Sequence, residues 1–293
     1  MLHKSTIHWT RTIVTGFILL VGLQSAARAD VSAYMITDSS RDFGTIDLNS
    51  GLYNSIGQTL SGSSPLELAG LGELGSTLYG ASLATGQGIL YTINTTTGAL
   101  TQQGTAALPN YVAFGSTLTT LYAVAEDNSG NFDLYSVNST TGAAAEVGAL
   151  GLKPGGDYTL STNSSTLYFT DDSAAFTPSL YTLSLTTGAA TLVGSTGGAQ
   201  FGGLVTEGGV LYGGAHNTLQ VDTLNTGTGA PTFVSTLDGT SSDFDGLAAI
   251  PATSGVPEPR TVSWLLLGLL AGAGWIKTRS NRQRLQPNNR TTE

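Results

Sequence analysis

The residues of this sequence that could do chemistry are mostly carboxylates. The chain has no cysteine, which excludes disulfides, thiolate metal sites and a cysteine nucleophile. His216 is the only histidine between residues 30 and 255, so a zinc site built on several histidines is also excluded. Acidic residues recur in polar segments that we expect to form loops on one face of the fold. They are Asp38, Asp42, Glu126, Asp127, Asp157, Asp171, Asp172 and Asp243, with His216 in an equivalent loop.

Two interpretations of these acids are open. Clustered carboxylates bind a hard cation such as Ca²⁺ through their oxygens, or hydrogen-bond to a sugar ring. On that interpretation the candidate metal ligands are Asp127, Asp157, Asp171 and Asp172. The simpler interpretation is that they are solvated turn residues, because aspartate favours turns and charged loops keep a surface soluble. It assigns no metal ligand and requires no cofactor.

No catalytic motif accompanies the acids. Cleavage of a glycosidic bond needs two carboxylates at a set separation, which a sequence does not supply. The pairs Gly202-Gly203 and Gly213-Gly214 lack the lysine and hydroxyl residue of a phosphate-binding loop, and indicate close packing of strands instead. Asn94 and Asn138 each begin an N-x-[ST] sequence, which we interpret as a turn rather than a glycosylation site. We therefore expect a protein that is not an enzyme.

Charge is distributed unevenly along the chain. Residues 30–255 contain 18 acidic residues and two basic ones, Arg41 and Lys153, a net charge of −16. Binding to nucleic acid requires a surface rich in lysine and arginine, so a nucleic-acid partner is excluded. The other nine basic residues lie in the two ends of the chain.

The middle of the chain is a repeat. Five tyrosines mark equivalent points at intervals of 45, 43, 46 and 44 residues, and they are Tyr34, Tyr79, Tyr122, Tyr168 and Tyr212. Three segments that begin at Ile89, Asp133 and Ser179 share the pattern Leu-Tyr, an alternating strand and a polar turn that ends in glycine. Alternation with period two predicts half-buried strands, and the glycines predict hairpin turns with positive φ. A repeat of 40 to 50 residues is typical of propeller blades.

Each repeat has room for four strands, of which the innermost precedes the tyrosine. The expected inner strands are 66–74, 111–115, 158–161, 201–205 and 244–250. The first repeat begins at its second strand, residues 33–37, and the last inner strand has no further repeat after it. Pairing these two ends would complete a sheet and leave no open edge. We therefore predict an all-β fold, a five-bladed β-propeller over residues 30–252, with another β-repeat or a sandwich as the alternative.

The N-terminal residues 1–29 predict a secretory signal peptide. Lys4 and Arg11 supply the positive start, residues 13–23 form the apolar run, and Ala27-Arg28-Ala29 supplies an A-x-A cleavage site. The apolar run is too short to cross a membrane, which needs about 20 residues.

The C-terminal residues predict a membrane anchor. Residues 261–276 form an apolar segment with tryptophan near each end, so we expect one transmembrane helix there. A basic cluster follows at Lys277, Arg279, Arg282 and Arg284. By the positive-inside rule the tail 277–293 is cytoplasmic and the body of the protein lies outside.

The linker 253–260 carries the motif Val256, Pro257, Glu258 and Pro259. This motif, followed by a short apolar helix and a basic cluster, resembles the PEP-CTERM sorting signal of Gram-negative bacteria. The resemblance covers residues 256–284 and implies recognition by an exosortase and a link to exopolysaccharide.

We thus expect an exported protein that is first anchored in the inner membrane and then reaches the cell surface or the extracellular matrix. Its repeat domain would act as a non-catalytic binding or structural platform. The alternatives are a secreted enzyme that acts on glycans and a cation-dependent lectin.

Overall fold

The computed structural model describes residues 31–38, 41–82, 88–105, 111–126, 129–153, 156, 158–171, 177–240 and 242–251. The chain divides into two compact units, Met1–Ile250 and Pro251–Glu293. The predicted signal peptide, the V-P-E-P motif, the predicted transmembrane segment and the basic cluster lie outside the described residues. Within the residues that are described, no helix is long and apolar enough to cross a membrane.

The described part of the first unit is all-β and consists of antiparallel four-stranded sheets in a β-propeller-like arrangement. The first sheet is β22 (Phe244–Ala249), β1 (Ser32–Thr37), β2 (Asp42–Asp47) and β3 (Tyr53–Gln58). The second is β6 (Leu68–Leu74), β7 (Thr77–Ser82), β8 (Leu90–Ile93) and β9 (Leu100–Gln102). The third is β10 (Tyr111–Ser116), β11 (Leu121–Glu126), β12 (Phe132–Val137) and β13 (Ala144–Ala149).

The remaining strands form two more such sheets and a small hairpin. The fourth sheet is β14 (Tyr158–Thr162), β15 (Leu167–Asp171), β16 (Ser179–Leu183) and β17 (Ala190–Ser195). The fifth is β18 (Phe201–Glu207), β19 (Val210–Ala215), β20 (Gln220–Leu224) and β21 (Pro231–Thr236). A short parallel pairing of β14 with β18 joins the fourth and fifth sheets. The hairpin of β4 (Leu60–Ser61) and β5 (Ser64–Pro65) lies between the first and second sheets in the chain and was not predicted.

Polar turns that end in glycine shape the outer hairpins. In the second sheet the N–H of Gly98, at φ 76°, donates to the carbonyl of Asn94 at 2.8 Å. The Oδ1 of Asn94 accepts from the N–H of Thr96 at 2.9 Å, and Asn138 does the same for Thr140 at 2.9 Å. These asparagines therefore act as turn residues, as the sequence predicts.

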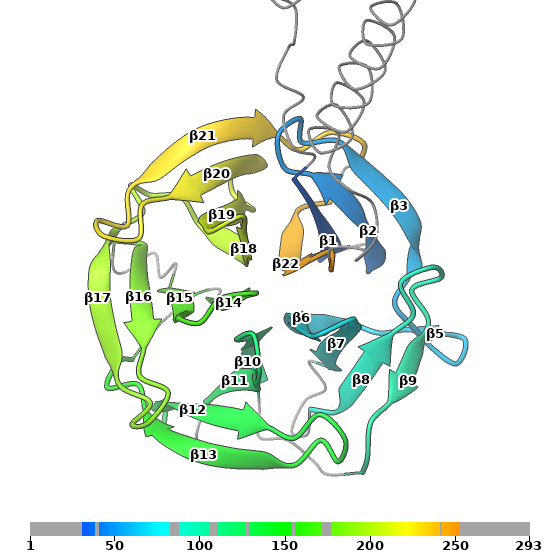
Figure 1. Ribbon diagram of the computed structural model, residues 1–293, viewed down its shortest axis with the longest axis horizontal. Coiled ribbons are helices and arrows are strands. Elements are labelled where there is room, and N and C mark those ends of the chain that lie inside the picture. The colour runs from blue at the N-terminus through cyan, green and yellow to red at the C-terminus, as the bar shows by residue number, and fades with distance from the viewer. Residues whose placement is uncertain are drawn as a thin grey trace, which may run out of the picture. The chain divides into compact units, whose positions relative to one another are not determined.

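The innermost strands of the five sheets surround a common centre, and the other strands of each sheet lie progressively further out (Figure 1). β6 packs against β22 and β10, β14 against β10 and β18, and β18 against β22, so that each inner strand contacts the next. The two ends of the repeat meet in the first sheet, where β1 pairs with β22 from Ala33 opposite Ala249 onward. We refer to this arrangement of the inner strands as the ring.

A separate apolar cluster fills each of the five gaps between neighbouring sheets. Five phenylalanines are among the largest fully buried side chains, and they are Phe43, Phe114, Phe169, Phe201 and Phe244. Burying one such ring stabilises the fold by about 1.5–3 kcal/mol. The core therefore lies between the sheets rather than on one side of any of them.

Glycines let the inner strands approach one another closely. A Cβ added to Gly203 of β18 would lie 2.8 Å from the backbone nitrogen of Leu247 in β22. At Gly202 an added Cβ would overlap the carbonyl oxygen of Phe244. The hydroxyl of Thr162 in β14 donates to the carbonyl of Leu247 at 3.2 Å, so two strands that are not neighbours also touch across the ring. The predicted role of the Gly202-Gly203 pair in close strand packing is confirmed.

Candidate functional site

A pocket of about 380 Å³ lies where the five inner strands begin. The first residues of each of these strands contribute to its wall: Ala69, Tyr111, Tyr158, Gly202 and Phe244. Because every inner strand begins at this pocket, all five run in the same direction and end on the opposite side of the ring. The pocket is in the range of volumes that hold small ligands.

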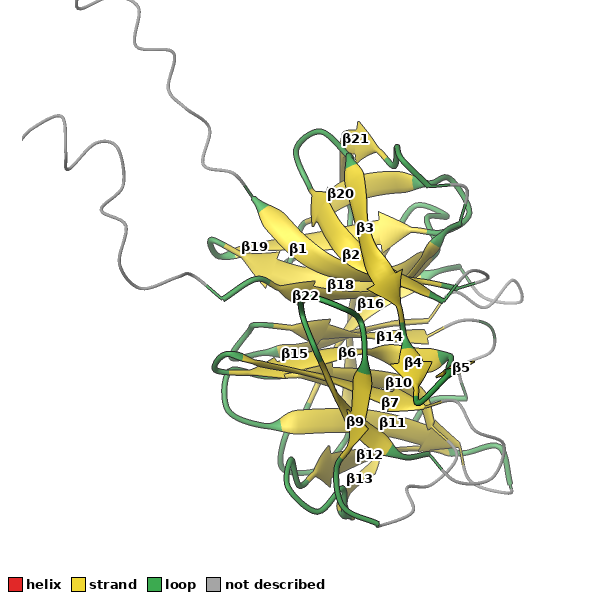
Figure 2. Cartoon of the chain, turned by 90° about the vertical axis from the view of Figure 1, so that its right-hand side faces the viewer, coloured by secondary structure: helices red, strands yellow, loops and turns green. Residues whose placement is uncertain are grey.

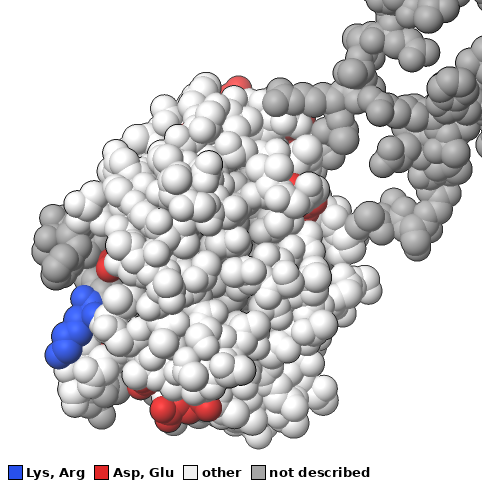
Figure 3. Space-filling model, turned by 60° about the vertical axis from the view of Figure 1, so that its left-hand side comes forward, with Lys and Arg blue, Asp and Glu red and all other residues white. Residues whose placement is uncertain are grey.

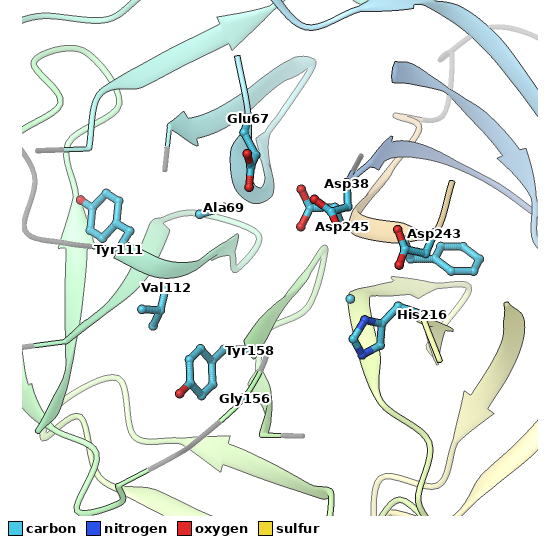
Figure 4. A pocket seen from close by; sticks show the side chains of 12 residues that line it. Asp38, Glu67, Ala69, Tyr111, Val112, Gly156, Tyr158, His216, Asp243 and Asp245 are labelled. Atoms are coloured by element: carbon cyan, nitrogen blue, oxygen red, sulfur yellow. The ribbon is translucent and has the colours of Figure 1, made fainter. Parts of the chain in front are cut away.

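Four carboxylates and one imidazole gather in the pocket. Asp38 follows β1, Glu67 precedes β6, Asp243 precedes β22, and Asp245 is the second residue of β22. Figure 4 shows the carboxylates of Asp38 and Asp245 near the middle of the view, with Glu67 on one side. Asp243 and His216 lie on the other side of the pocket in the same view.

One basic side chain reaches this group of acids. The guanidinium of Arg41, which lies just before β2, is 3.1 Å from Oε2 of Glu67. Both side chains are 40% exposed, so the pair contributes little stability but holds Glu67 in place beside the pocket. The pocket thus gathers four carboxylates against a single guanidinium, and it therefore favours cationic or hydrogen-bond-donating ligands.

An aromatic wall faces the acids. Tyr158 lies between Phe132 and Phe169, with ring centroids 5.2 and 6.2 Å from its own, which fixes the orientation of its ring. Tyr111 is 3% exposed, and burial raises the pKa of its phenol, which therefore stays neutral. Val112 completes this wall (Figure 4). Carboxylates on one side and aromatic rings on the other suit a ligand with hydroxyl groups and an apolar face, such as a sugar.

The sequence-predicted site residues are only partly brought together. Asp38, Asp243 and His216 line the pocket as expected. Asp42, Glu126 and Asp171 do not line it: Asp42 accepts a hydrogen bond from Ser55 at 2.9 Å, Glu126 is exposed at the end of β11, and Asp171 is buried at the end of β15. The other candidates lie outside the described residues, and they are Asp127, Asp157 and Asp172.

Glu67 and Asp245 were not predicted as site residues. Both fall inside or beside segments that the apolar pattern assigns to inner strands. Each is a charged residue at the beginning of an otherwise apolar segment, and this position could have identified it. At the beginning of an inner strand, a side chain can still reach the open end of the ring.

Among the described residues, no group of three or more histidine, aspartate or glutamate side chains is arranged to hold a metal ion. Figure 3 shows that most of the surface on the face in view carries no charge, with acidic side chains in a few separate places. The acidic side chains on that face are dispersed, whereas the pocket gathers four carboxylates.

No protein-family model matches the chain, and no curated protein sequence is similar to it. Among solved structures, a chain of a nidogen/laminin complex is 11% identical with a TM-score of 0.45, and the match covers 75% of this chain and 98% of that one. TolB from Acinetobacter baumannii is 15% identical with a TM-score of 0.41, over 69% of this chain and 52% of TolB. The extracellular domain of a putative one-component system from Bacteroides thetaiotaomicron is 14% identical with a TM-score of 0.38, over 67% of this chain and 25% of that one.

Proposed function

We propose that the chain is an exported surface or matrix protein whose repeat domain binds a polysaccharide, without catalysis, in the acidic pocket. The observation that carries this proposal is the position of the pocket relative to the chain ends. Ala33 pairs with Ala249, so Val31 and Ile250, the first and last described residues of the first unit, lie at the end of the ring opposite the pocket. Figure 2 shows the start of β1 and the end of β22 on the same side of the unit.

The fold that supports this function is a closed five-bladed β-propeller. Each of the five sheets is one blade, and the first blade combines β22 from the end of the repeat with β1 to β3 from its beginning. Backbone hydrogen bonds also join the outer parts of neighbouring blades. The N–H of Ala190 donates to the carbonyl of Leu150 at 2.9 Å, and the N–H of Tyr53 donates to Asp238 at 2.8 Å. The second of these bonds links the last blade to the first.

The two ends of the chain determine where the protein is located. Residues 1–29 direct export, and residues 261–276 form a transmembrane helix that holds the protein in the inner membrane. The motif at residues 256–259 is recognised by an exosortase, which releases the protein to the cell surface or the matrix of a Gram-negative bacterium. The chain leaves the repeat domain at the end of the ring opposite the pocket, so this attachment does not require the pocket to be covered.

The chemistry of the pocket selects among polysaccharides. Carboxylates accept hydrogen bonds from sugar hydroxyls, and the partly exposed Tyr158 offers an apolar contact at the wall of the pocket. Anionic polysaccharides are repelled by the four acids, so the ligand is a neutral or amino-sugar polymer. Because the pocket is open at one end of the ring, it can receive one sugar unit of a long chain.

The test of binding is titration of the full-length protein with polysaccharide purified from the cells that make it, followed by calorimetry. We expect Asp38→Asn and Asp245→Asn each to weaken binding at least tenfold. Asp133→Asn, the same change on β12 away from the pocket, serves as the matched control and retains full affinity. Equal binding by all three variants would refute the assignment of the pocket.

The same samples separate the alternatives. Shortened polysaccharide after prolonged incubation would replace the binding function with a glycan-active enzyme. Binding that a chelator abolishes would instead indicate a cation-dependent lectin.

The sorting proposal has its own measurement, the intact mass and terminal peptides of the protein from native cells. Loss of residues 1–29 and of everything beyond residues 257–259 is expected. A C-terminus intact through Glu293 would overturn exosortase processing.

A further inference from the structure

Two acids lie at the end of the ring where the inner strands finish, far from the pocket described above. Glu73 is the next-to-last residue of β6, and Glu207 is the last residue of β18. Both strands pack against β22, so the two glutamates approach the same part of the ring from its two sides. Neither acid has a role in the proposed polysaccharide site.

One oxygen of the Glu73 carboxylate is buried without a hydrogen-bond partner among the described residues. Glu73 is only 8% exposed, and its buried Oε2 has no hydrogen-bond partner among the described residues. Oε1 of Glu207 is likewise buried and unpartnered within the described part of the chain. Asn163, which follows β14, donates its side-chain N–H to the carbonyl of Thr206 at 2.9 Å and leaves that Glu207 oxygen unsatisfied. Buried oxygens without a partner destabilise a fold unless a ligand satisfies them.

The two carboxylates also interact electrostatically. Burial and the negative charge of Glu207 raise the pKa of Glu73 to about 8, and burial raises the pKa of Glu207 as well. The charge of Glu207 therefore acts on Glu73, yet no hydrogen bond joins the two side chains among the described residues.

The protein supplies no cation to this pair from its described residues. Residues 31–251 contain one arginine, one lysine and one histidine, and the histidine, His216, lies in the pocket. Arg41 is paired with Glu67 beside the pocket, and Lys153 is exposed in the segment that leads into β14, at the pocket end of the ring. The positive charge that the two glutamates need at neutral pH must come from a proton or from a bound ion.

Other oxygen atoms line the same end of the ring. Glu73, Ser116 and Thr206 occupy equivalent positions, since each lies opposite the leucine that precedes the repeat tyrosine. The hydroxyl oxygen of Ser116 accepts a hydrogen bond from the N–H of Glu73 at 3.0 Å. Oxygen atoms from carboxylates, amides, carbonyls and water are the ligands that hard cations prefer.

We propose that Glu73 and Glu207 bind a hard cation of the Ca²⁺ class at the end of the ring where the inner strands finish. The ion satisfies the unpartnered oxygens and replaces the proton that Glu73 otherwise retains. It bridges β6 and β18 across the end of β22 and so ties the second sheet to the fifth. Because the ion competes with a proton, it binds more tightly as the pH rises.

The test is calorimetric titration of full-length protein, in detergent at 0.15 M NaCl and freed of metals with a chelator, using CaCl₂ alone. At pH 8.5 we expect one Ca²⁺ to bind per chain, with a dissociation constant of about 10⁻⁴–10⁻³ M, as in other extracellular modules. At pH 6.0 the affinity falls at least tenfold, since the glutamates then hold protons. Ca²⁺ also raises the melting temperature at pH 8.5.

Glu73→Gln and Glu207→Gln should each weaken this binding at least tenfold. Glutamine has the shape of a protonated glutamate, so both variants keep the fold, which their melting curves verify. Glu146→Gln makes the same change at an exposed position of β13 and should bind Ca²⁺ like the wild type. The proposal is overturned if the wild type takes up no Ca²⁺ at pH 8.5, or if uptake survives both substitutions.

Discussion

Replacing Gly203 with alanine tests how closely the inner strands must approach for the ring to form. An alanine Cβ at this position would lie 2.8 Å from the nitrogen of Leu247, 2.9 Å from the carbonyl carbon of Gly246 and 2.9 Å from Cγ of Leu247. Ordinary contacts of a methyl group are about 3.4–4 Å, so β18 and β22 would have to separate by roughly half an ångström to one ångström. Two of the three atoms belong to the backbone, which has no alternative rotamer.

The expected cost follows from two opposing terms. Overpacking of a close-packed core costs about 1–3 kcal/mol, and the backbone contacts place Gly203→Ala near the upper end. Alanine is favoured over glycine within a strand by about 0.5–1 kcal/mol, which offsets part of this cost. The net loss is about 2 kcal/mol, which lowers the melting temperature by roughly 4–8 °C for a domain of this size.

Thermal unfolding followed by circular dichroism measures the effect. Gly227→Ala is the matched control, because its nearest neighbour is the side-chain oxygen of Asn225 at 3.4 Å and nothing has to move. We expect Gly227→Ala to melt at or slightly above the wild-type temperature. If Gly203→Ala also melts within 1 °C of the wild type, the close approach of β18 and β22 is refuted.

Three further predictions concern the turns, the ring and the buried acid. Gly98→Ala should cost about 2–3 kcal/mol in unfolding experiments, because Gly98 has φ 76° and a Cβ there lies 2.6 Å from the carbonyl oxygen of Gln58. Gly62→Ala, at φ 65° with no atom within 4 Å, should cost only about 1 kcal/mol, and equal losses would contradict the predicted contact. Thr162→Val should lose about 1–2 kcal/mol in the same assay, because it leaves the buried carbonyl of Leu247 without its donor. Without Ca²⁺, the wild type should lose stability as the pH rises from the ordinary glutamate pKa of 4.5 to about 8, since folded Glu73 holds its proton more tightly than unfolded Glu73. Solvent screening limits this loss to about 2 kcal/mol, and Glu73→Gln should reduce it in melting curves recorded across that range.

Much of the fold could be predicted from the sequence because the same strand pattern recurs five times along the chain. The expected inner strand 111–115 corresponds to β10, and the expected strand 33–37 corresponds to β1. β1 pairs with β22 as the incomplete first repeat indicated. The hairpin of β4 and β5 escaped prediction because its residues, rich in serine and glycine, occur in one repeat only and carry no alternating pattern.

The candidate site was harder to predict than the fold. The repeat pattern predicts which segments form strands, but it does not predict at which residue each strand begins. Glu67 and Asp245 were assigned to inner strands, yet β6 begins at Leu68 and Asp245 is only the second residue of β22. Glu73 could have been recognised as a candidate site residue, because it is the single acid within the buried strand Leu68–Leu74. A charge in such a strand costs free energy and therefore calls for a partner.

Because the ring is narrow, the proposed polysaccharide pocket at one end and the proposed cation site at the other can bind their ligands separately. The hydrogen bond between Thr162 and Leu247 crosses the ring, and the glycines of β18 allow its backbone to meet that of β22. Contacts of this kind bring the inner strands together between the two ends of the ring, beyond the residues that line the pocket. Glu73 and Glu207 lie at the far end of the ring, where the inner strands finish and where β1 begins. An ion bound there would stabilise the ring without occupying the pocket, and substitutions at one end should leave binding at the other unchanged.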